Sequence, residues 1–416
     1  MKIIYLVHQF YPESWTGTEK FVLKMSTMAQ NNGQIVKVIT YSFYEDSFYD
    51  KICGDTLYKE FSYKGIPVIA LKHKKNNPTD NISLGDSSMS KIAREILKNE
   101  NPDIIHVGHP MRVNEFIFCA MELNIPYLIT LTDFWLLCPS TVLINSRGDL
   151  CKGPDNGEEC KKYCGEYPSN FIAQRSTASR EIMLGASMII SPSLFLSTLF
   201  ERVINNIHIE VINHGMSYTS LKKNTQKYNP GDRITFCYAG SLNHHKGIHI
   251  LIETLKGIES DKFTLKIYGG GTDEVYKNKL LEMVGGDRRF EFCGRYSEDN
   301  VGNILNNIDV VIVPSLWYEN YPLVLHEALS CNVPVITSNI GGMAEKVKNN
   351  INGFTFPVGD KDTLRFIINN ILDNPTLLNN IKDNMKYNFF PTVEQEAISY
   401  HNRYLQIFRE NYQETT

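Results

Sequence analysis

Short apolar runs alternate along the chain with stretches in which apolar residues recur at helical spacing. In the first half, Phe21, Val22, Met25, Met28 and Ala29 fall on one face of a helix predicted over residues 21–31. The apolar runs of this half predict strands at 3–7, 36–40, 104–107, 127–131 and 187–190, with a further helix at 114–122. Such alternation favours a parallel sheet covered by helices on both faces.

The same alternation restarts after about residue 210. Strands are predicted at 234–239, 264–268, 289–292, 310–313 and 334–337, with helices between them that include 248–255 and 324–330. Near the end, Val393, Ala397, Tyr400, Tyr404 and Phe408 recur at helical spacing and predict a closing helix. The pattern therefore predicts an α/β chain with two Rossmann-like domains.

The restart of the pattern places the domain boundaries. We expect an N-terminal Rossmann-like domain over 1–210, a C-terminal one over 211–390 and the closing helix over 391–416. Residues 138–166 are polar and rich in Cys, so they are interpreted as an insertion in the first domain. Doubly wound sheets bind ligands beyond the carboxyl ends of their strands. This much would equally fit a dehydrogenase, a kinase or a periplasmic-type binding protein.

Charge and hydropathy limit the classes of partner. The formal net charge is −4, so the chain lacks the basic field with which proteins hold nucleic acid. No apolar run approaches the roughly 18 residues that span a bilayer, and residues 1–8 lack the cleavage site of a signal peptide. We therefore expect a cytoplasmic protein. The basic run at 72–75 is expected to be a solvated loop; the alternative is a contact with an acidic acceptor or with anionic lipid, as in a protein peripheral to the inner membrane face.

The richest polar stretch, residues 314–329, follows the strand predicted at 310–313 and runs into a helix. The amides of Leu323 and Val324 would lie at that helix N-terminus, where they suit a diphosphate. Glu319 and Glu327 would repel an anion there, so they are better suited to accept hydrogen bonds from sugar or ribose hydroxyls. The alternative is that these acids only favour the helix N-terminus through its dipole.

Glu319 and Glu327, with seven residues between them, resemble the Glu-x7-Glu motif of the family-4 retaining glycosyltransferases. Further segments resemble that family in order along the chain: residues 238–242 with Lys246-Gly247, 268–271, 293–295, and 334–337 through Gly341-Gly342 to Asn352-Gly353. The resemblance implies the GT-B fold, in which two Rossmann-like domains face each other across a cleft and the C-terminal helix packs back on the N-terminal domain.

The resemblance also implies roles for residues of the second domain. Glu327 would hold the ribose hydroxyls, Glu319 would contact the donor sugar, and Lys246 would lie on the diphosphate and stabilise the leaving group. The catalytic set implied is Glu319, Lys246 and His109. The donor-binding set implied is Gly17, Gly240, Ser241, Lys246, Gly270, Gly271, Arg295, Glu319, Asn320, Leu323, Val324 and Glu327.

Residues 11–19 of the first domain resemble the family's Gly-Gly loop, with only Gly17 kept and Thr18 in place of the second glycine. This loop would approach the diphosphate or the acceptor, or else form a plain strand–helix turn. His109 loosely matches the histidine that the family places near the reacting centre; the alternative is a hydrogen-bonded structural histidine. Thr132 and Asp133 resemble the family's acceptor-side His-Asp motif.

One departure from the family concerns the diphosphate site. The family has an arginine where Ser241 stands, and its loss removes a bidentate phosphate clamp. Either His244, His245 or Arg295 would replace that arginine, or Lys246 and the helix amides would suffice.

Four of the nine cysteines lie close together in the sequence: Cys138, Cys151, Cys160 and Cys164. Such a group could bind zinc or an iron–sulfur cluster tetrahedrally. The spacing is looser than a paired Cys-x2-Cys arrangement, so disulfide or redox chemistry and unlinked thiols remain alternatives. A metal at this position would be structural, because it would staple a loop with little core of its own. No cofactor is expected for catalysis.

These observations predict a retaining, metal-independent glycosyltransferase of the hexosyltransferase type. It would move a sugar from a nucleotide-diphosphate-sugar donor to a glycan or lipid-linked acceptor, in the biosynthesis of a surface polysaccharide or glycolipid. Two alternatives remain: a nucleotide-sugar epimerase on the same fold, and a non-catalytic nucleotide-sugar-binding subunit.

Overall fold

A computed structural model describes residues 1–75, 82–165, 167, 170–217, 221–271, 273–385 and 390–413. The chain forms two compact units. Unit 1 comprises Met1–Asn213 together with Val393–Thr416, and unit 2 comprises His214–Thr392. The chain thus completes unit 1 only after it has passed through the whole of unit 2.

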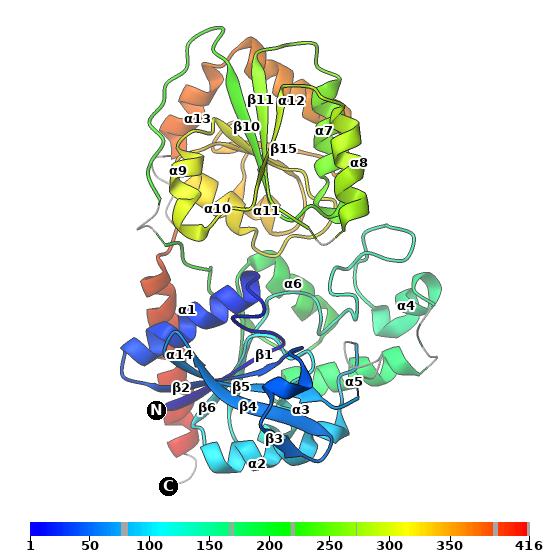
Figure 1. The fold of residues 1–416 in the computed structure, drawn as a ribbon, viewed down its shortest axis with the longest axis vertical. Coiled ribbons are helices and arrows are strands. Elements are labelled where there is room, and N and C mark those ends of the chain that lie inside the picture. Colours follow the sequence, from blue (N-terminus) through cyan, green and yellow to red (C-terminus); the bar gives the residue numbers. More distant parts are fainter. Residues whose placement is uncertain are drawn as a thin grey trace. The chain divides into compact units, whose positions relative to one another are not determined.

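Unit 1 is built on a sheet that has nine strands within the described residues, in the order β3-β4-β5-β2-β1-β6-β7-β8-β9 (Figure 1). The strands are β1 Lys2–Val7, β2 Ile35–Tyr41, β3 Lys51–Cys53, β4 Thr56–Tyr63, β5 Ile66–His73, β6 Ile104–Val107, β7 Tyr127–Thr130, β8 Met188–Ser191 and β9 Ile209–Val211. The sheet is parallel from β5 to β9. Strands β3 and β4 extend one edge in antiparallel pairing.

Helices cover the sheet of unit 1. They are α1 Gly17–Asn31, α2 Ser90–Glu100, α3 Glu115–Glu122, α4 Glu158–Tyr163, α5 Phe171–Leu184, α6 Leu194–Val203 and α14 Val393–Gln413, with short 3-10 turns at Asp46–Phe48, Ser87–Met89 and Asp155–Gly157. The predicted closing helix is α14, which packs on α1 and β6 and so returns to the N-terminal unit as expected (Figure 1). Its Tyr404 hydroxyl lies 2.7 Å from Nδ1 of the fully buried His106 and 3.2 Å from the hydroxyl of Tyr5.

Unit 2 contains a parallel sheet of six strands within the described residues, in the order β12-β11-β10-β13-β14-β15. The strands are β10 Ile234–Ala239, β11 Phe263–Tyr268, β12 Phe290–Gly294, β13 Val310–Val313, β14 Val335–Ser338 and β15 Gly353–Phe356. The helices are α7 Ile248–Lys256, α8 Glu274–Val284, α9 Val301–Leu305, α10 Leu323–Ser330, α11 Gly341–Lys346, α12 Lys361–Asp373 and α13 Leu377–Met385, with 3-10 turns at His244–Lys246 and Glu298–Asn300. Figure 1 shows α7 and α8 on one side of this sheet and α9 and α10 on the other.

These two sheets confirm the predicted α/β class with two Rossmann-like domains. The strands at 104–107, 234–239 and 310–313 have the predicted bounds, because each is a mainly apolar run that begins directly after a charged residue and ends at Gly or Pro. The expectation of a loop over 72–75 was wrong in part, since Lys72 and His73 are the last residues of β5. The β4–β5 hairpin was missed. Its turn is Lys64-Gly65, with φ of 49° and 82° at the two residues, and only the glycine signals such a turn in sequence.

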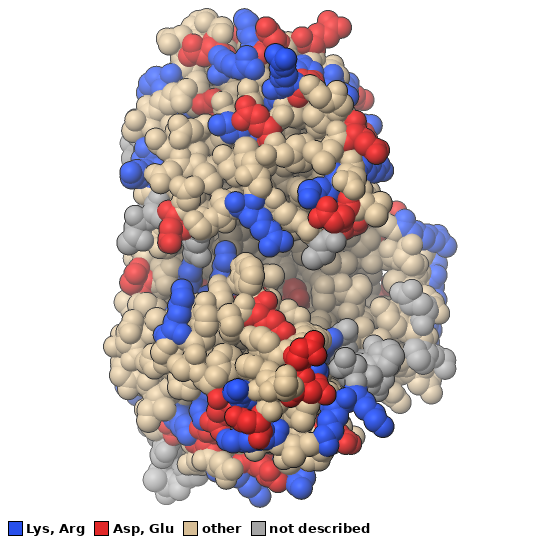
Figure 2. Space-filling model, in the orientation of Figure 1, with Lys and Arg blue, Asp and Glu red and all other residues tan. Residues whose placement is uncertain are grey.

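The surface has mixed charge on the face shown in Figure 2, where acidic and basic side chains are interspersed. This distribution agrees with the small net charge and gives that face no extended basic area. Among the described residues, no helix has both the length and the apolar character that crossing a membrane requires.

Candidate functional site

Lys246 and Glu319 form the centre of a polar cluster in unit 2. Lys246 ends the 3-10 turn after β10, and Glu319 lies in the loop between β13 and α10. Lys246 Nζ is 2.7 Å from Glu319 Oε1. Because β10 and β13 are neighbouring parallel strands, the loops at their carboxyl ends meet at one edge of the sheet. The sequence predicted both residues for one site but not that they touch.

Two residues that the sequence analysis did not single out complete the hold on Glu319. Ser315 Oγ donates to Glu319 Oε1 at 2.7 Å, and Trp317 Nε1 donates to the same oxygen at 2.9 Å. Lys246 Nζ also lies 4.7 Å from the centre of the Trp317 ring. Burial raises the pKa of the Glu319 carboxyl, but the Lys246 charge and the hydrogen bonds outweigh burial and hold that pKa below its usual range. Glu319 is therefore a carboxylate at neutral pH.

Three glycines fix the backbone around this pair. A Cβ on Gly247, whose φ is 71°, would come within 1.9 Å of the Pro314 carbonyl oxygen. Gly342 N–H donates to the Glu319 carbonyl at 2.7 Å, and a Cβ on Gly342 would lie 2.2 Å from the Asn320 carbonyl oxygen. A Cβ on Gly341, whose φ is 58°, would lie 2.8 Å from the Glu319 carbonyl oxygen. Only glycine permits such approaches, so these residues hold the Lys246 and Glu319 loops in place.

The second glycine loop follows β11. A Cβ on Gly269, whose φ is 147°, would meet the Gly240 carbonyl oxygen at 1.8 Å, so the loops after β10 and β11 are in close contact. Leu242 N–H donates to the Gly270 carbonyl at 3.1 Å, and Gly271 packs on Leu242. The structure thus brings Gly240, Gly270 and Gly271 together, next to Lys246.

The structure narrows the possible replacements for the family arginine. Ser241 Oγ accepts a 3.3 Å hydrogen bond from Asn243. Burial, reinforced by the Lys246 charge, lowers the pKa of His245 to about 4, so His245 is neutral at pH 7 and cannot act as a cation. His244 stacks on the ring of His249 at 4.4 Å. Arg295 is exposed and lies directly over Gly270, where an added Cβ would be 2.6 Å from its Nε.

Helix α10 carries the remaining predicted donor residues. Leu323 and Val324 are its first two residues, and the hydrogen bonds within the helix begin with the amide of Leu325. Glu327 is half-buried one turn further along. His326 is fully buried, with its ring 3.6 Å from that of Tyr321 and Nδ1 2.9 Å from the Pro322 carbonyl. Stacking and burial of His326 anchor the helix, so its N-terminus has a fixed position.

In unit 1, His109 and Asp133 form a second polar cluster. His109 Nε2 is 2.9 Å from Asp133 Oδ2, and its Nδ1 accepts a hydrogen bond from the Met111 amide. Because Nδ1 accepts, the Nε2 atom carries the proton and donates it to the carboxylate. Asp133 Oδ1 in turn accepts from the Trp135 amide at 2.8 Å, and Thr132 Oγ1 donates to the Gly108 carbonyl at 3.1 Å. Both ring nitrogens of His109 are thus engaged.

The first loop of unit 1 differs from a glycine-rich phosphate loop. Thr16 is the N-cap residue of α1. The carboxylate of the fully buried Glu19 accepts hydrogen bonds from the Thr16 amide at 2.5 Å and from the Thr16 hydroxyl at 2.6 Å. This capping box already places a negative charge at the helix N-terminus. Gly17 is exposed, and an added Cβ would meet nothing within 4 Å. His8, which the sequence analysis passed over, packs on His109 at 4.1 Å and lies 3.5 Å from Glu19.

The four cysteines of the predicted insertion line one pocket of about 790 Å³ in unit 1. The pKa of Cys160 is raised by burial and further by the nearness of the other three thiols. Cys151 Sγ accepts from the Gly153 amide at 3.4 Å, and all nine cysteines of the chain are unlinked. Within the described residues, no three His, Cys, Asp or Glu side chains already form a set of metal ligands. The metal therefore stays a prediction.

Part of the chain is similar to a known protein family, and longer stretches are similar to known glycosyltransferases. Residues 221–387 match the family model described as Glycosyl transferases group 1. An uncharacterized glycosyltransferase of Methanocaldococcus jannaschii is 25% identical over 79% of this chain and 81% of its own length. A second one from that organism is 28% identical over 40% of this chain and 43% of its own length. Lipopolysaccharide 1,2-N-acetylglucosaminetransferase of Salmonella typhimurium is 28% identical over 40% of this chain and 48% of its own length.

Solved structures of low sequence identity share the fold. Sucrose-phosphate synthase from Thermosynechococcus elongatus superposes with a TM-score of 0.70 over 98% of this chain and 99% of its own, at 19% identity. Anabaena HepE in complex with UDP and glucose gives a TM-score of 0.67 over 97% of this chain and 99% of its own, at 16% identity. The chain therefore has the fold of these GT-B glycosyltransferases, and the part that matches the family model lies in unit 2.

Proposed function

We propose that this protein is a retaining glycosyltransferase. It moves a sugar from a nucleotide-diphosphate-sugar donor to a glycan or lipid-linked acceptor, in the synthesis of a surface polysaccharide or glycolipid at the cytoplasmic face of the membrane. The observation that carries the proposal is the Lys246–Glu319 contact of 2.7 Å, held in a glycine-fixed site beside the N-terminus of α10. A cation for a leaving group and an acceptor for sugar hydroxyls thus lie side by side.

The relatives support this class of reaction. One is named a lipopolysaccharide N-acetylglucosaminetransferase, and structures of similar fold include Anabaena HepE with UDP-glucose and WaaG, a glycosyltransferase involved in lipopolysaccharide biosynthesis. These names favour a nucleotide-sugar donor and a cell-surface product for the present chain.

The donor is expected to bind in unit 2 through four kinds of group. The diphosphate accepts hydrogen bonds from the amides of Leu323 and Val324 at the start of α10. Lys246 supplies a positive charge to the same phosphates, and Arg295, which lies over the glycine loop, takes the place of the family arginine. Glu327 accepts hydrogen bonds from the ribose hydroxyls.

Glu319 is well suited to the donor sugar because its two oxygens differ. Lys246, Ser315 and Trp317 all bond to Oε1. No described residue forms a hydrogen bond with Oε2, so that oxygen is available to a sugar hydroxyl. Rigid placement of such an acceptor orients the sugar before the reaction and lowers the entropy that must be lost in the transition state.

In the reaction, the bond between the sugar carbon C1 and the diphosphate oxygen breaks while an acceptor hydroxyl oxygen bonds to C1 on the same face. The hydroxyl proton passes to the departing phosphate oxygen. Lys246 stabilises the negative charge that develops on the diphosphate, which requires no metal ion. His109 positions the reacting groups and does not remove a proton, because its Nδ1 and Nε2 atoms are engaged with Met111 and Asp133.

The test is a donor screen on the full chain. UDP-, GDP- and ADP-sugars are compared by thermal shift, since a ligand at 100 times its Kd adds about 2.7 kcal/mol of stability. Glycosyl transfer and nucleotide release are then measured with the best donor, with and without EDTA. We expect one donor class to stabilise the protein and to turn over with EDTA present.

Two variants locate the site. Lys246→Ala should lower turnover by roughly 100-fold or more, and Glu327→Ala should weaken nucleotide binding. Lys361→Ala, which removes an exposed pair with Glu253, is the control. A stabilising nucleotide sugar that is never turned over would instead indicate a binding subunit. Turnover of the donor to an isomer without acceptor would indicate an epimerase.

A further inference from the structure

A polar pocket in unit 1 lies outside the residues discussed so far. It has a volume of about 370 Å³, which is enough for one sugar ring. Its walls come from the turn between β3 and β4, from the end of β5, from the segment before α2 and from the loop between β6 and α3. The lining residues used below are Asp55, His73, Lys75, Asp86, Ser88, Arg112 and Asn114.

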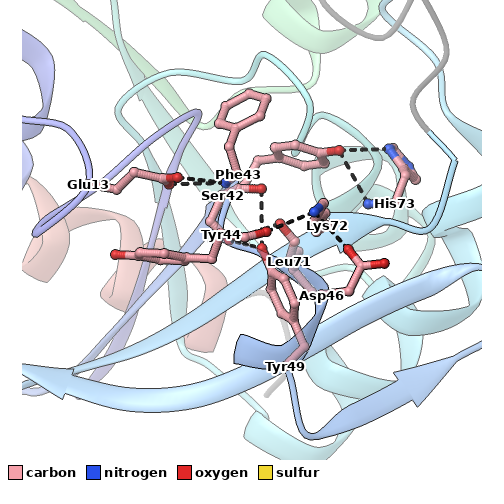
Figure 3. Close-up of polar contacts among 10 residues, drawn as sticks. Glu13, Ser42, Phe43, Tyr44, Asp46, Tyr49, Leu71, Lys72 and His73 are labelled. Carbon is pink, nitrogen blue, oxygen red and sulfur yellow. Dashed lines mark hydrogen bonds and ion pairs between the residues drawn. The ribbon is translucent and has the colours of Figure 1, made fainter.

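One wall is a chain of close polar contacts. His73 Nε2 is 2.8 Å from Asp86 Oδ2, and His73 Nδ1 is 3.3 Å from the Tyr41 hydroxyl. Ser88 donates to Asp86 Oδ1 from its amide at 3.2 Å and from its hydroxyl at 2.5 Å. Figure 3 shows His73 next to Lys72, whose ammonium bonds to the Tyr44 carbonyl and to Asp46. The end of β5 is therefore held in place by several contacts, and the Lys72 ammonium is already bound by Tyr44 and Asp46.

The opposite wall holds an arginine in an unusual conformation. Arg112 has a φ of 63°, a left-handed conformation that is strained for a residue other than glycine. Its guanidinium lies over two aromatic rings, 4.8 Å from the centre of Tyr41 and 4.2 Å from that of Phe43. Strain of this kind persists when the surrounding structure requires the side chain at that place.

Asn114 supplies the polar group that points to a ligand. It is the N-cap residue of α3, a position where Asn ordinarily accepts a hydrogen bond from the helix, yet its side chain forms no cap bond. The residue is 1% exposed, and its Nδ2 has no hydrogen-bond partner among the described residues. A buried amide without a partner has lost the hydrogen bonds that water would give it, so a ligand group that accepts a hydrogen bond would relieve this penalty.

The charges of the pocket select a neutral ligand. Two acids, Asp55 and Asp86, face two bases, Lys75 and Arg112, around the same cavity. An anion would be attracted by one pair and repelled by the other. Hydroxyl groups both donate and accept, so they can satisfy carboxylates, a guanidinium and an amide at once.

The pocket shares one loop with His109. Arg112 follows His109 by three residues in the loop between β6 and α3. The Arg112 charge contributes to lowering the pKa of His8, whose ring packs on His109 at 4.1 Å. A ligand in the pocket would thus lie close to the histidine that the proposed function places at the reaction.

We propose that this pocket binds a neutral sugar ring of the acceptor, with the Asn114 amide donating to one of its hydroxyl or ring oxygens. The assignment rests on the proposed function, because it identifies the acceptor as a glycan. It names the end of the acceptor that the enzyme recognises, and it makes Asn114 a binding residue and the His73–Asp86–Ser88 chain its support.

The experiment uses ligand-observed NMR on the full chain with glucose, galactose, mannose, N-acetylglucosamine and their 4-nitrophenyl glycosides, and with inorganic phosphate as a separate probe. Asn114→Leu removes the unpaired amide and keeps the branched shape of the side chain, and Asn99→Leu, on the exposed face of α2, is the matched control. We expect at least one sugar to bind, and its Kd to rise about tenfold in Asn114→Leu but not in Asn99→Leu.

Thermal stability separates binding from a structural role. Losing an unpaired amide should leave the Tm of Asn114→Leu unchanged or higher, whereas a structural asparagine would lower it. The inference is overturned if no sugar binds or if phosphate binds in the pocket instead. It is also overturned if the Kd for the sugar is the same in Asn114→Leu as in the wild type. Nucleotide-sugar binding by the wild-type protein is followed independently, so failure of this inference and failure of the proposed function give different results.

Discussion

Glu319 turns one oxygen towards Lys246 at 2.7 Å and keeps the other clear of hydrogen bonds with any described residue. The same carboxylate therefore neutralises a lysine in the ligand-free protein and presents an acceptor to a ligand. When a diphosphate binds, Lys246 gains a second anionic partner, and Glu319 remains tied to Ser315 and Trp317. The charge of the Glu319 carboxylate and the position of the loop that carries it can be tested with separate variants.

The variant Glu319→Gln retains an oxygen for Ser315 and Trp317 but removes the charge that faces Lys246. We expect transfer to fall by roughly 100-fold, with the Kd for free nucleotide changed by less than about threefold. A transfer assay measures the rate, and calorimetry measures the Kd for free nucleotide. Glu253→Gln, which removes an exposed partner of Lys361, should behave as wild type. Equal losses in transfer and nucleotide affinity would contradict a role on the sugar.

Gly342→Ala tests the close packing behind Glu319. The added Cβ would lie 2.2 Å from the Asn320 carbonyl oxygen, so the loop that carries Glu319 must shift. We expect a loss of about 1–3 kcal/mol in stability and a transfer rate at least tenfold lower. Chemical denaturation and the transfer assay measure these. Gly165→Ala is the control, because the Cβ added there would have its nearest neighbouring atom 3.6 Å away. An unchanged transfer rate in Gly342→Ala would show that the loop tolerates movement.

Asp133→Asn tests the proton position on His109. If the new Oδ1 keeps the Trp135 hydrogen bond, the new amide group faces His109 Nε2 and forces the proton onto Nδ1, where it meets the Met111 amide. We expect transfer to fall by roughly 100-fold while nucleotide binding by unit 2 is unchanged. Nitrogen NMR of the ring reports the tautomer. A wild-type tautomer together with a wild-type rate would refute the positioning role.

Acid should destabilise unit 1 through His106. Burial lowers its pKa to about 3, while Nδ1 and Nε2 bond to the hydroxyls of Tyr404 and Thr130. Its folded pKa lies below its unfolded value of about 6.5, so the unfolded state binds more protons and stability falls as pH drops from 6.5 towards 3, by up to about 1.4 kcal/mol per pH unit.

His106→Gln should therefore reduce the slope of Tm against pH between 6.5 and 4. His208→Gln, at a side chain that is 93% exposed, should keep the wild-type slope. If the slope in His106→Gln equals that of the wild type, other groups account for the acid sensitivity.

The cysteine cluster makes a prediction about metal content. If the four thiols hold a structural ion, they must converge from their positions around the pocket. We expect protein purified under reducing conditions to carry one zinc ion or one cluster per chain, and Cys160→Ser to lose it. Elemental analysis and the absorption spectrum distinguish the two metals. Cys293→Ser, at an exposed site outside the cluster, is the control; metal-free wild-type protein would refute the prediction.

How far the sequence predicts this molecule depends on whether a feature is local. Strand β13 is wholly apolar, and a polar loop follows it directly. This local pattern is enough to predict a ligand site there and to place Glu319 at the end of a strand. Its contact with Lys246 spans 73 positions and exists because β10 and β13 are neighbours, which no local pattern contains. The pocket around Asn114 depends on four separate segments and was missed for the same reason.

The return of α14 to unit 1 has a consequence for how the chain is made. Met216 pairs with Thr392 in an isolated bridge, and its amide donates to the Pro391 carbonyl at 2.8 Å, so the two ends of unit 2 are adjacent. Unit 2 can close once residue 392 has left the ribosome. Unit 1 still lacks the tyrosines that cover His106 at that moment, so its folding finishes last although its first strand is synthesised first.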